Sequence, residues 1–155
     1  MTLGDTLSPS QILPDMQSRH HWPAIEELMA QLVVSGRVDK AASPSILEAL
    51  QAREEAMSTG IGCGVAIPHT SSEHVTEVVA AFGRSEKGIE FNSLDGQPVT
   101  LMVLFIVPMH QFQLHLRTLA AIAKFLNDRR TREELLAAPD TEAILSILRR
   151  KPGGH

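Results

Sequence analysis

Hydrophobic residues are most concentrated between Val99 and Val107, where eight of nine positions are apolar. A strand with one solvent-exposed face alternates apolar and polar residues, so this continuous run predicts a strand that is covered on both faces. Proline cannot donate to a strand ladder, and Pro108 is therefore expected to end the strand. The run predicts the centre of a sheet with helices packed on both sides.

Shorter segments predict further strands around this centre. Val65–Ile67 and Val78–Arg84 are short and apolar, and Gly88–Phe91 is a further extended piece before a turn at Asp95-Gly96. A short edge strand is also expected near the N-terminus, among Ile12, Leu13 and Met16.

Two helices are expected before the sheet, because apolar residues recur there with a period of 3.6. Pro23 suits the first turn of one helix, and Gly36 is expected to stop it. Ser43 precedes Pro44 as a capping residue of the second helix. The apolar faces consist of Trp22, Ile25, Leu28, Met29 and Leu32 in the first, and Ile46, Leu47, Leu50 and Met57 in the second.

Helical periodicity returns after the central strand. The spacing of His115, Leu119, Ile122 and Leu126 follows i, i+4, i+7 and i+11, which is one face of a helix. This pattern predicts a helix from about Gln111 to Leu126, with His115 in or near its first turn.

The C-terminal segment predicts two shorter helices. Thr131 and Glu134 have the spacing of a capping box, which opens a helix ending at Ala137, and Asp140 opens the last helix. Strands in the middle of the chain with helices before and after them predict an α/β (α+β) fold with a sheet between helices in three layers. We expect a single domain over residues 1–155, with an ordered core at about 7–148.

The segment from Thr59 to Thr70 joins the two halves of the sequence. Three glycines alternate in it at positions 60, 62 and 64, so the backbone can adopt positive φ and other groups can approach it closely. Pro68 fixes φ and favours an extended Ile67. We therefore expect a rigid loop tip that presents the imidazole of His69.

The second histidine of interest is His115, which is expected at a helix start just beyond a strand end. A helix N-terminus offers N–H groups to an anion and favours a neutral imidazole. Arg53 provides a guanidinium for two-point contact with phosphate oxygens, and the hydroxyls of Ser58 and Thr59 are additional donors. The combination predicts a nucleophile with an anion cradle, as phosphoryl transfer requires.

Each of these residues has an ordinary structural explanation when taken alone. A lone histidine is more often a surface or core residue, and a lone arginine is more often a solvated helix charge. The histidine pairs His69/His74 and His110/His115 are five residues apart, which misses the i, i+4 spacing of helical metal ligands, so no metal site is predicted. Only the combination of these residues in one chain favours a functional role for them.

Composition narrows the classes of partner. The formal charge of −4 and the aromatic content of 4% without tyrosine argue against a nucleic-acid surface. No apolar run is long enough for membrane insertion, and the N-terminus does not have the pattern of a signal peptide, so a cytoplasmic location is expected. The single cysteine, Cys63, suits a reducing compartment and a structural role beside glycines. The chain has neither a Walker loop nor a dinucleotide fingerprint, and no cofactor is predicted.

Three segments carry a family resemblance: STGIGCGVAIPHT, DGQPV and HLRTLAAIAKFL. They resemble the enzyme IIA domain of the fructose/mannitol type in the bacterial phosphotransferase system, nearest its stand-alone nitrogen-regulatory branch. The resemblance extends over roughly Leu7 to Leu148. It implies a mixed sheet between helices.

The resemblance also implies roles for individual residues and partners. His69 would accept a phosphoryl group from a histidine-containing phosphocarrier protein, and His115 and Arg53 would lie at the phosphate. The group would then pass to a IIB protein, or phosphorylation would regulate another target protein. An alternative of another class is a non-catalytic interaction module of the same fold, in which His69 is never phosphorylated; whether the chain is an enzyme is thus left open.

The chain departs from the family pattern at Thr70, where the family has a small residue. The branched side chain would either add a hydroxyl donor at the phosphate or narrow the access of a partner at the rim of the site. We favour the second interpretation, because the small residue usual in the family at the position of Thr70 shows that catalysis does not require a hydroxyl there.

Overall fold

The computed structural model describes residues 3–56, 60–91 and 95–150 of the chain. The strands form one mixed sheet, ordered β1-β5-β6-β3-β2, with β4 also paired to β6. The strands are β1 (Ile12–Leu13), β2 (Gly60–Gly62), β3 (Val65–Ala66), β4 (His69–Ser72), β5 (Val79–Ile89) and β6 (Val99–Pro108). Strand β5 is antiparallel to β6, whereas β3 and β4 are parallel to it.

Strand β6 occupies the centre of the sheet, as the apolar run predicts. Every residue of β6 except Thr100 is buried. Side chains alternate between two hydrophobic clusters, with Leu104 and Ile106 in one and Phe105 and Val107 in the other. The prediction of a strand covered on both faces is therefore confirmed.

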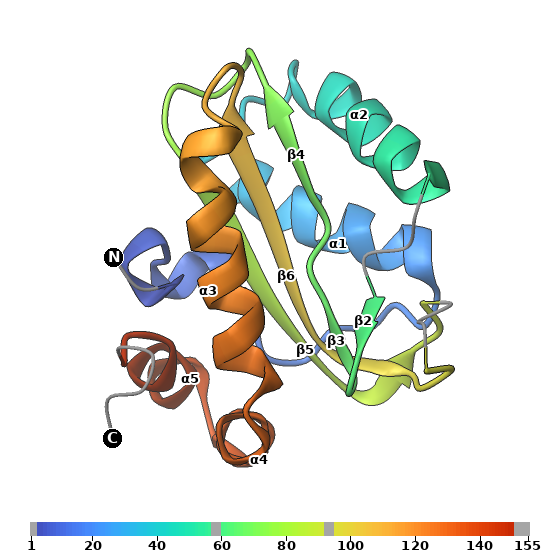
Figure 1. Ribbon diagram of the computed structural model, residues 1–155, viewed down its shortest axis with the longest axis vertical. Helices are drawn as coiled ribbons and strands as arrows, with labels where there is room; N and C mark the ends of the chain where they lie inside the picture. Colours follow the sequence, from blue (N-terminus) through green and yellow to red (C-terminus); the bar gives the residue numbers. More distant parts are fainter. Residues whose placement is uncertain (1–2, 57–59, 92–94, 151–155) are drawn as a thin grey trace.

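Helices cover both faces of the sheet and complete three layers (Figure 1). Helices α1 (His21–Val34) and α2 (Ser43–Ala56) contribute to the first hydrophobic cluster. The second cluster is covered by α3 (Leu116–Asn127), α4 (Arg129–Ala137) and α5 (Thr141–Leu148), together with residues of the short 3-10 helix η1 (Leu3–Thr6). The expected sandwich of a mixed sheet between helices is confirmed.

Strands β3 and β4 share one register along β6. Val65 is opposite Leu101 and His69 is opposite Phe105, so the offset along the chain is the same in both strands. The backbone N–H of Phe105 donates to the Pro68 carbonyl at 3.0 Å, which maintains the ladder across the gap. The prediction of a loop tip at His69 was wrong: His69 begins a strand, because the chain re-enters the same ladder directly after the proline.

Several predicted boundaries also differ. Met16 is buried but lies beyond β1, and β5 continues to Ile89, which joins two segments that were expected to be separate. The predicted helix at about Gln111 begins as the 3-10 helix η3 (Gln113–His115), so α3 starts only after His115. Met57 lies outside the described residues.

Helix α4 has a different cap from the predicted one. Its N-cap is Asp128, whose carboxylate accepts from both the backbone N–H and the hydroxyl of Thr131. Thr131 is thus the third residue of the helix and not its cap, because Asp128 is extended and provides the acceptor three residues earlier. The cap of α5 is Asp140, as expected.

None of the helices in the described ranges is long and apolar enough to cross a membrane.

Candidate functional site

The imidazole of His69 is held at both ring nitrogens. Nδ1 lies 2.6 Å from the carbonyl oxygen of Ile67, and Nε2 lies 3.0 Å from Nη2 of Arg53. A carbonyl can only accept and a guanidinium can only donate. We therefore assign the proton to Nδ1 and the lone pair to Nε2, so that the neutral ring presents one nucleophilic nitrogen.

The strand register decides which face of the sheet His69 occupies. In the parallel ladder, His69 pairs with Phe105 and Thr70 pairs with Ile106. Phe105 lies in the cluster beneath α3, whereas Ile106 lies in the cluster beneath α1 and α2. Because successive strand residues point to opposite faces, His69 is on the α3 side and Thr70 is on the α2 side.

Arg53 reaches His69 from α2, in the last turns of that helix. Its side chain is exposed, and α2 packs along β4. Among the described strands β4 pairs only with β6, so its other edge is open. This open edge allows a guanidinium from the α2 side to contact a ring on the α3 side.

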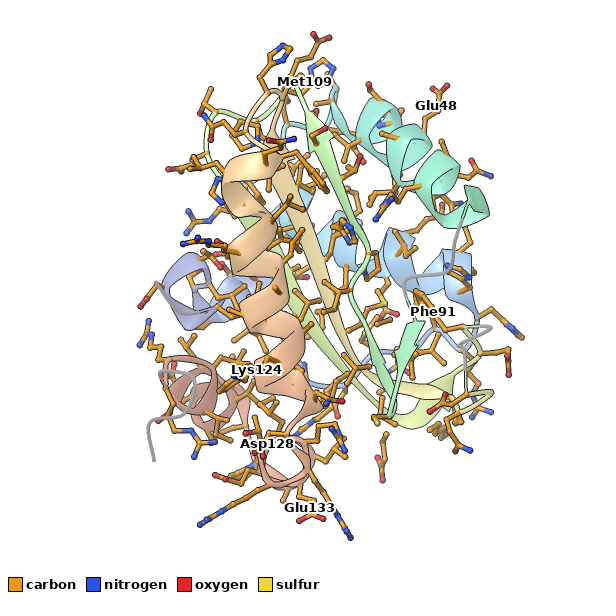
Figure 2. All side chains as sticks on the ribbon, in the orientation of Figure 1. Glu48, Phe91, Met109, Lys124, Asp128 and Glu133 are labelled. Carbon is orange, nitrogen blue, oxygen red and sulfur yellow. The ribbon has the colours of Figure 1, made fainter. Side chains whose placement is uncertain are left out.

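The segment after β6 folds back towards His69. His110 has φ of 73°, in the left-handed region, and the N–H of Gln111 donates to the carbonyl of Pro108 at 3.0 Å. Figure 2 shows Met109 at the end of the molecule where β4 ends and α3 begins. The turn places the ring of Phe112 against the His69 imidazole, with centroids 6.1 Å apart and planes inclined by 17°.

His115 enters the site region from the start of α3. It is the N-cap of that helix, and its side chain makes no capping hydrogen bond. Its ring meets the Phe105 ring edge-on, with centroids 6.4 Å apart. Phe105 is the strand partner of His69, so it has both histidines as neighbours. The structure thus brings His69 and Arg53 into contact, and it places His115 against Phe105, the strand partner of His69.

The remaining candidate residues are placed less directly. Ser58 and Thr59 lie outside the described residues. Thr70 is half-buried, and its hydroxyl makes one long contact, 3.4 Å, to the carbonyl of Ser71. Their contribution to phosphate binding stays a prediction.

Asp95 anchors the glycine-rich turn between β2 and β3. Its carboxylate accepts from the backbone N–H of Cys63 at 2.8 Å and from that of Gln97 at 3.0 Å. These hydrogen bonds, the one from Cys63 first, hold the pKa of the Asp95 carboxyl below its ordinary value, because they stabilise the charged form. Cys63 itself has φ of 57° and takes part through its backbone.

Chemically, the site offers one nucleophilic nitrogen and one permanent positive charge at the same point. That combination suits attack on an anionic electrophile such as a phosphoryl group. Within the described residues, His, Cys, Asp and Glu form no group of three that could hold a metal ion.

Sequence reasoning did not identify Phe112 as a site residue. It falls in the turn after a strand, outside the periodic face of α3, and an aromatic residue there carries no motif. Its position follows from the turn at His110, which depends on tertiary structure.

Comparison with known proteins supports the family resemblance. The family model for the phosphoenolpyruvate-dependent sugar phosphotransferase system, EIIA 2, matches residues 5–151. A nitrogen regulatory protein of Bradyrhizobium diazoefficiens is 35% identical over 153 residues, which are 98% of this chain and 97% of that protein.

Solved structures show the same fold. The crystal structure of nitrogen regulatory protein IIA-Ntr from Neisseria meningitidis superposes with a TM-score of 0.83 and 32% identity, covering 94% of this chain and 98% of that one. The complex of enzyme IIAMTL and phosphorylated enzyme IIBMTL from Escherichia coli gives a TM-score of 0.76 at 20% identity, covering 92% of this chain and 96% of that one.

Proposed function

The chain belongs to the EIIA 2 family of the phosphoenolpyruvate-dependent sugar phosphotransferase system, and on that premise we propose that Nε2 of His69 is its phosphoryl acceptor. The observation that carries the proposal is the pair of contacts at the His69 ring. The Ile67 carbonyl accepts a hydrogen bond from Nδ1, which keeps the proton on that nitrogen. The guanidinium of Arg53 donates to Nε2, which therefore carries the lone pair.

In the first transfer, the Nε2 lone pair attacks the phosphorus of a phosphohistidine on a carrier protein. The new phosphorus–nitrogen bond forms as the old one breaks, and the donor nitrogen keeps the electron pair of the broken bond. Nδ1 remains bonded to hydrogen, and its contact with the Ile67 carbonyl stabilises the positive charge that the phosphorylated ring acquires. In the second transfer, a nucleophile on the acceptor protein attacks the same phosphorus, and the phosphoryl group leaves Nε2 of His69 for that protein.

Arg53 has to change partner during this step. Its guanidinium and the incoming phosphorus approach the same nitrogen, so the contact to Nε2 is released as the bond forms. The positive charge then lies beside the phosphoryl oxygens, where it stabilises the charge of the transition state. We assign His115, at the N-terminus of α3, to orienting the phosphoryl group from the other side.

The partners follow from the chemistry and from the relatives. The donor is a histidine-containing phosphocarrier protein, because nothing in the sequence identifies a nucleotide site that would activate phosphate within this chain. The acceptor is a IIB protein, as in the mannitol enzyme complex, or a protein that responds to the phosphorylated state, as the nitrogen regulatory relatives suggest. We place the reaction in the cytoplasm, where phosphoenolpyruvate is formed.

The test is incubation with phosphoenolpyruvate, enzyme I and the phosphocarrier protein, followed by intact-mass measurement. The parent protein should gain the mass of one phosphoryl group, and His69→Ala should gain none. The label should be labile in acid and stable in base, as a phosphoramidate is. A label that survives acid, or that remains in His69→Ala, overturns the assignment. If the parent protein takes no label, the non-catalytic interaction module becomes the better interpretation.

A further inference from the structure

The ring of Phe112 lies almost parallel to the imidazole of His69. The centroids are 6.1 Å apart and the planes differ by 17°, which is an offset stack. Phe112 is half-buried and packs against the hydrophobic cluster beneath α3.

The turn that carries Phe112 is well defined by backbone contacts. The N–H of His115 donates to the carbonyls of Phe112, at 3.1 Å, and of Gln111, at 3.3 Å. The left-handed conformation of His110 reverses the chain just before this turn. One short segment therefore places Phe112 on the His69 ring and delivers His115 to the start of α3.

Phosphoryl transfer affects the two hydrogen-bond contacts of the His69 ring differently. In the proposed reaction Arg53 leaves Nε2 as phosphorus arrives, whereas the hydrogen bond from Nδ1 to Ile67 is kept. The loss of the Arg53 contact removes one restraint against a pivot of the imidazole about Nδ1. A parallel aromatic ring limits this pivot, because tilting the imidazole would break the stack.

We propose that Phe112 is a positioning residue, which holds the plane of the His69 imidazole while Arg53 exchanges Nε2 for the phosphoryl group. The inference rests on the proposed function, since it concerns the moment of transfer to His69. Holding a reacting atom in its line of attack is a large part of what a protein contributes to phosphoryl transfer. Phe112 acts through His69 and does not touch the reacting phosphorus.

The kinetic test compares four proteins in single-turnover transfer from the phosphorylated carrier. Aromatic pairs contribute ≈ 0.5–1.5 kcal/mol, so Phe112→Leu should lower the maximal transfer rate about two- to twelvefold, with an unchanged half-saturating carrier concentration. Phe112→Tyr keeps a planar ring and should retain most of the rate. Leu114→Ala removes a neighbouring exposed apolar side chain, which is 72% exposed, and should match the parent protein.

The control separates positioning from docking. If Phe112 served only as part of an apolar docking surface, Phe112→Leu and Leu114→Ala would both raise the half-saturating carrier concentration and leave the maximal rate unchanged. That result overturns the proposal. A parent-like maximal rate in Phe112→Leu also overturns it, whatever Leu114→Ala does.

A second measurement tests the stack without any phosphorylation. The ring current of an aromatic side chain displaces the NMR signals of protons close to it, so the ring-proton shifts of His69 should change in Phe112→Leu and stay near the parent values in Phe112→Tyr. No difference between the parent protein and Phe112→Leu would mean that the stack does not exist. If the parent protein takes no phosphoryl label, the proposed function fails, and these shifts still decide whether Phe112 holds the imidazole.

Discussion

Replacing Arg53 by alanine should slow phosphoryl transfer to His69 without moving the label. The guanidinium contacts Nε2 at 3.0 Å, which is the atom that bonds phosphorus in the proposed reaction. Removing it leaves His69 fixed by Ile67 and able to accept, but without a positive charge beside the phosphoryl oxygens. The effect should therefore fall on the rate and not on the site of labelling.

The size of the effect follows from the position of the charge. Two unit charges 4 Å apart interact by about 1 kcal/mol in water and by about 4 kcal/mol at the effective dielectric near a protein surface. Loss of a single oxyanion donor slows enzymes by about 10²–10³-fold. Because Arg53 is exposed, we expect the lower end of that range, about 10²-fold, and a parent rate that falls with added salt.

Arg53→Lys should restore only part of the rate. Lysine keeps the charge but cannot make the planar two-point contact with phosphoryl oxygens. The assay is quenched-flow transfer of labelled phosphate from the phosphocarrier protein. Arg130→Ala is the matched control, because that exposed side chain pairs only loosely with Glu134, at 3.7 Å, and its loss changes the net charge equally. Parent-like rates in both Arg53 variants would refute the role given to the guanidinium.

Three further predictions concern neighbouring features. Thr70→Gly should leave the lifetime of phospho-His69 unchanged in the isolated protein, since Thr70 faces the α2 side; a shorter lifetime that Thr70→Ser does not share would contradict this placement. Asp95→Asn should lower the melting temperature at neutral pH. The folded pKa of Asp95 lies below its ordinary value of 3.8, so the stabilisation by the charged carboxylate is complete above that value and is lost as pH falls through the folded pKa. The difference in melting temperature between the variant and the parent should therefore vanish in acid, and a difference that widens in acid would refute this prediction. Asp128→Ala should reduce the free energy of unfolding by about 1 kcal/mol through the lost α4 cap, measured by denaturant titration, and a neutral result would mean that the cap is not needed.

The fold could be predicted well where a local pattern matches a buried environment. The apolar run of β6 and the 3.6-residue periodicity of α1 each indicate their element directly, because burial on both faces or on one helical face leaves a distinct pattern. The start of α4 could not be read with the same certainty. Both Asp128 and Thr131 suit an N-cap, and the choice depends on which of them is extended in the folded chain.

The site could be predicted only in part, because its geometry depends on long-range pairing. The motif around Pro68 singled out His69, but its place in a strand depends on Phe105, which is far along the chain. Arg53 was a candidate because guanidinium suits phosphate, whereas its contact with Nε2 requires the open edge of β4. Phe112 has no sequence signal, since only the turn at His110 brings it to the imidazole.

The most direct test of the central claim identifies which ring nitrogen of His69 carries the phosphoryl group. Protein with isotopically labelled histidine is phosphorylated through the phosphocarrier, and phosphorus–nitrogen coupling is read by NMR. We predict that phosphorus couples to Nε2, while Nδ1 keeps its proton and its hydrogen bond to the carbonyl of Ile67. Coupling to Nδ1, or to a ring nitrogen of any other histidine, would contradict the account.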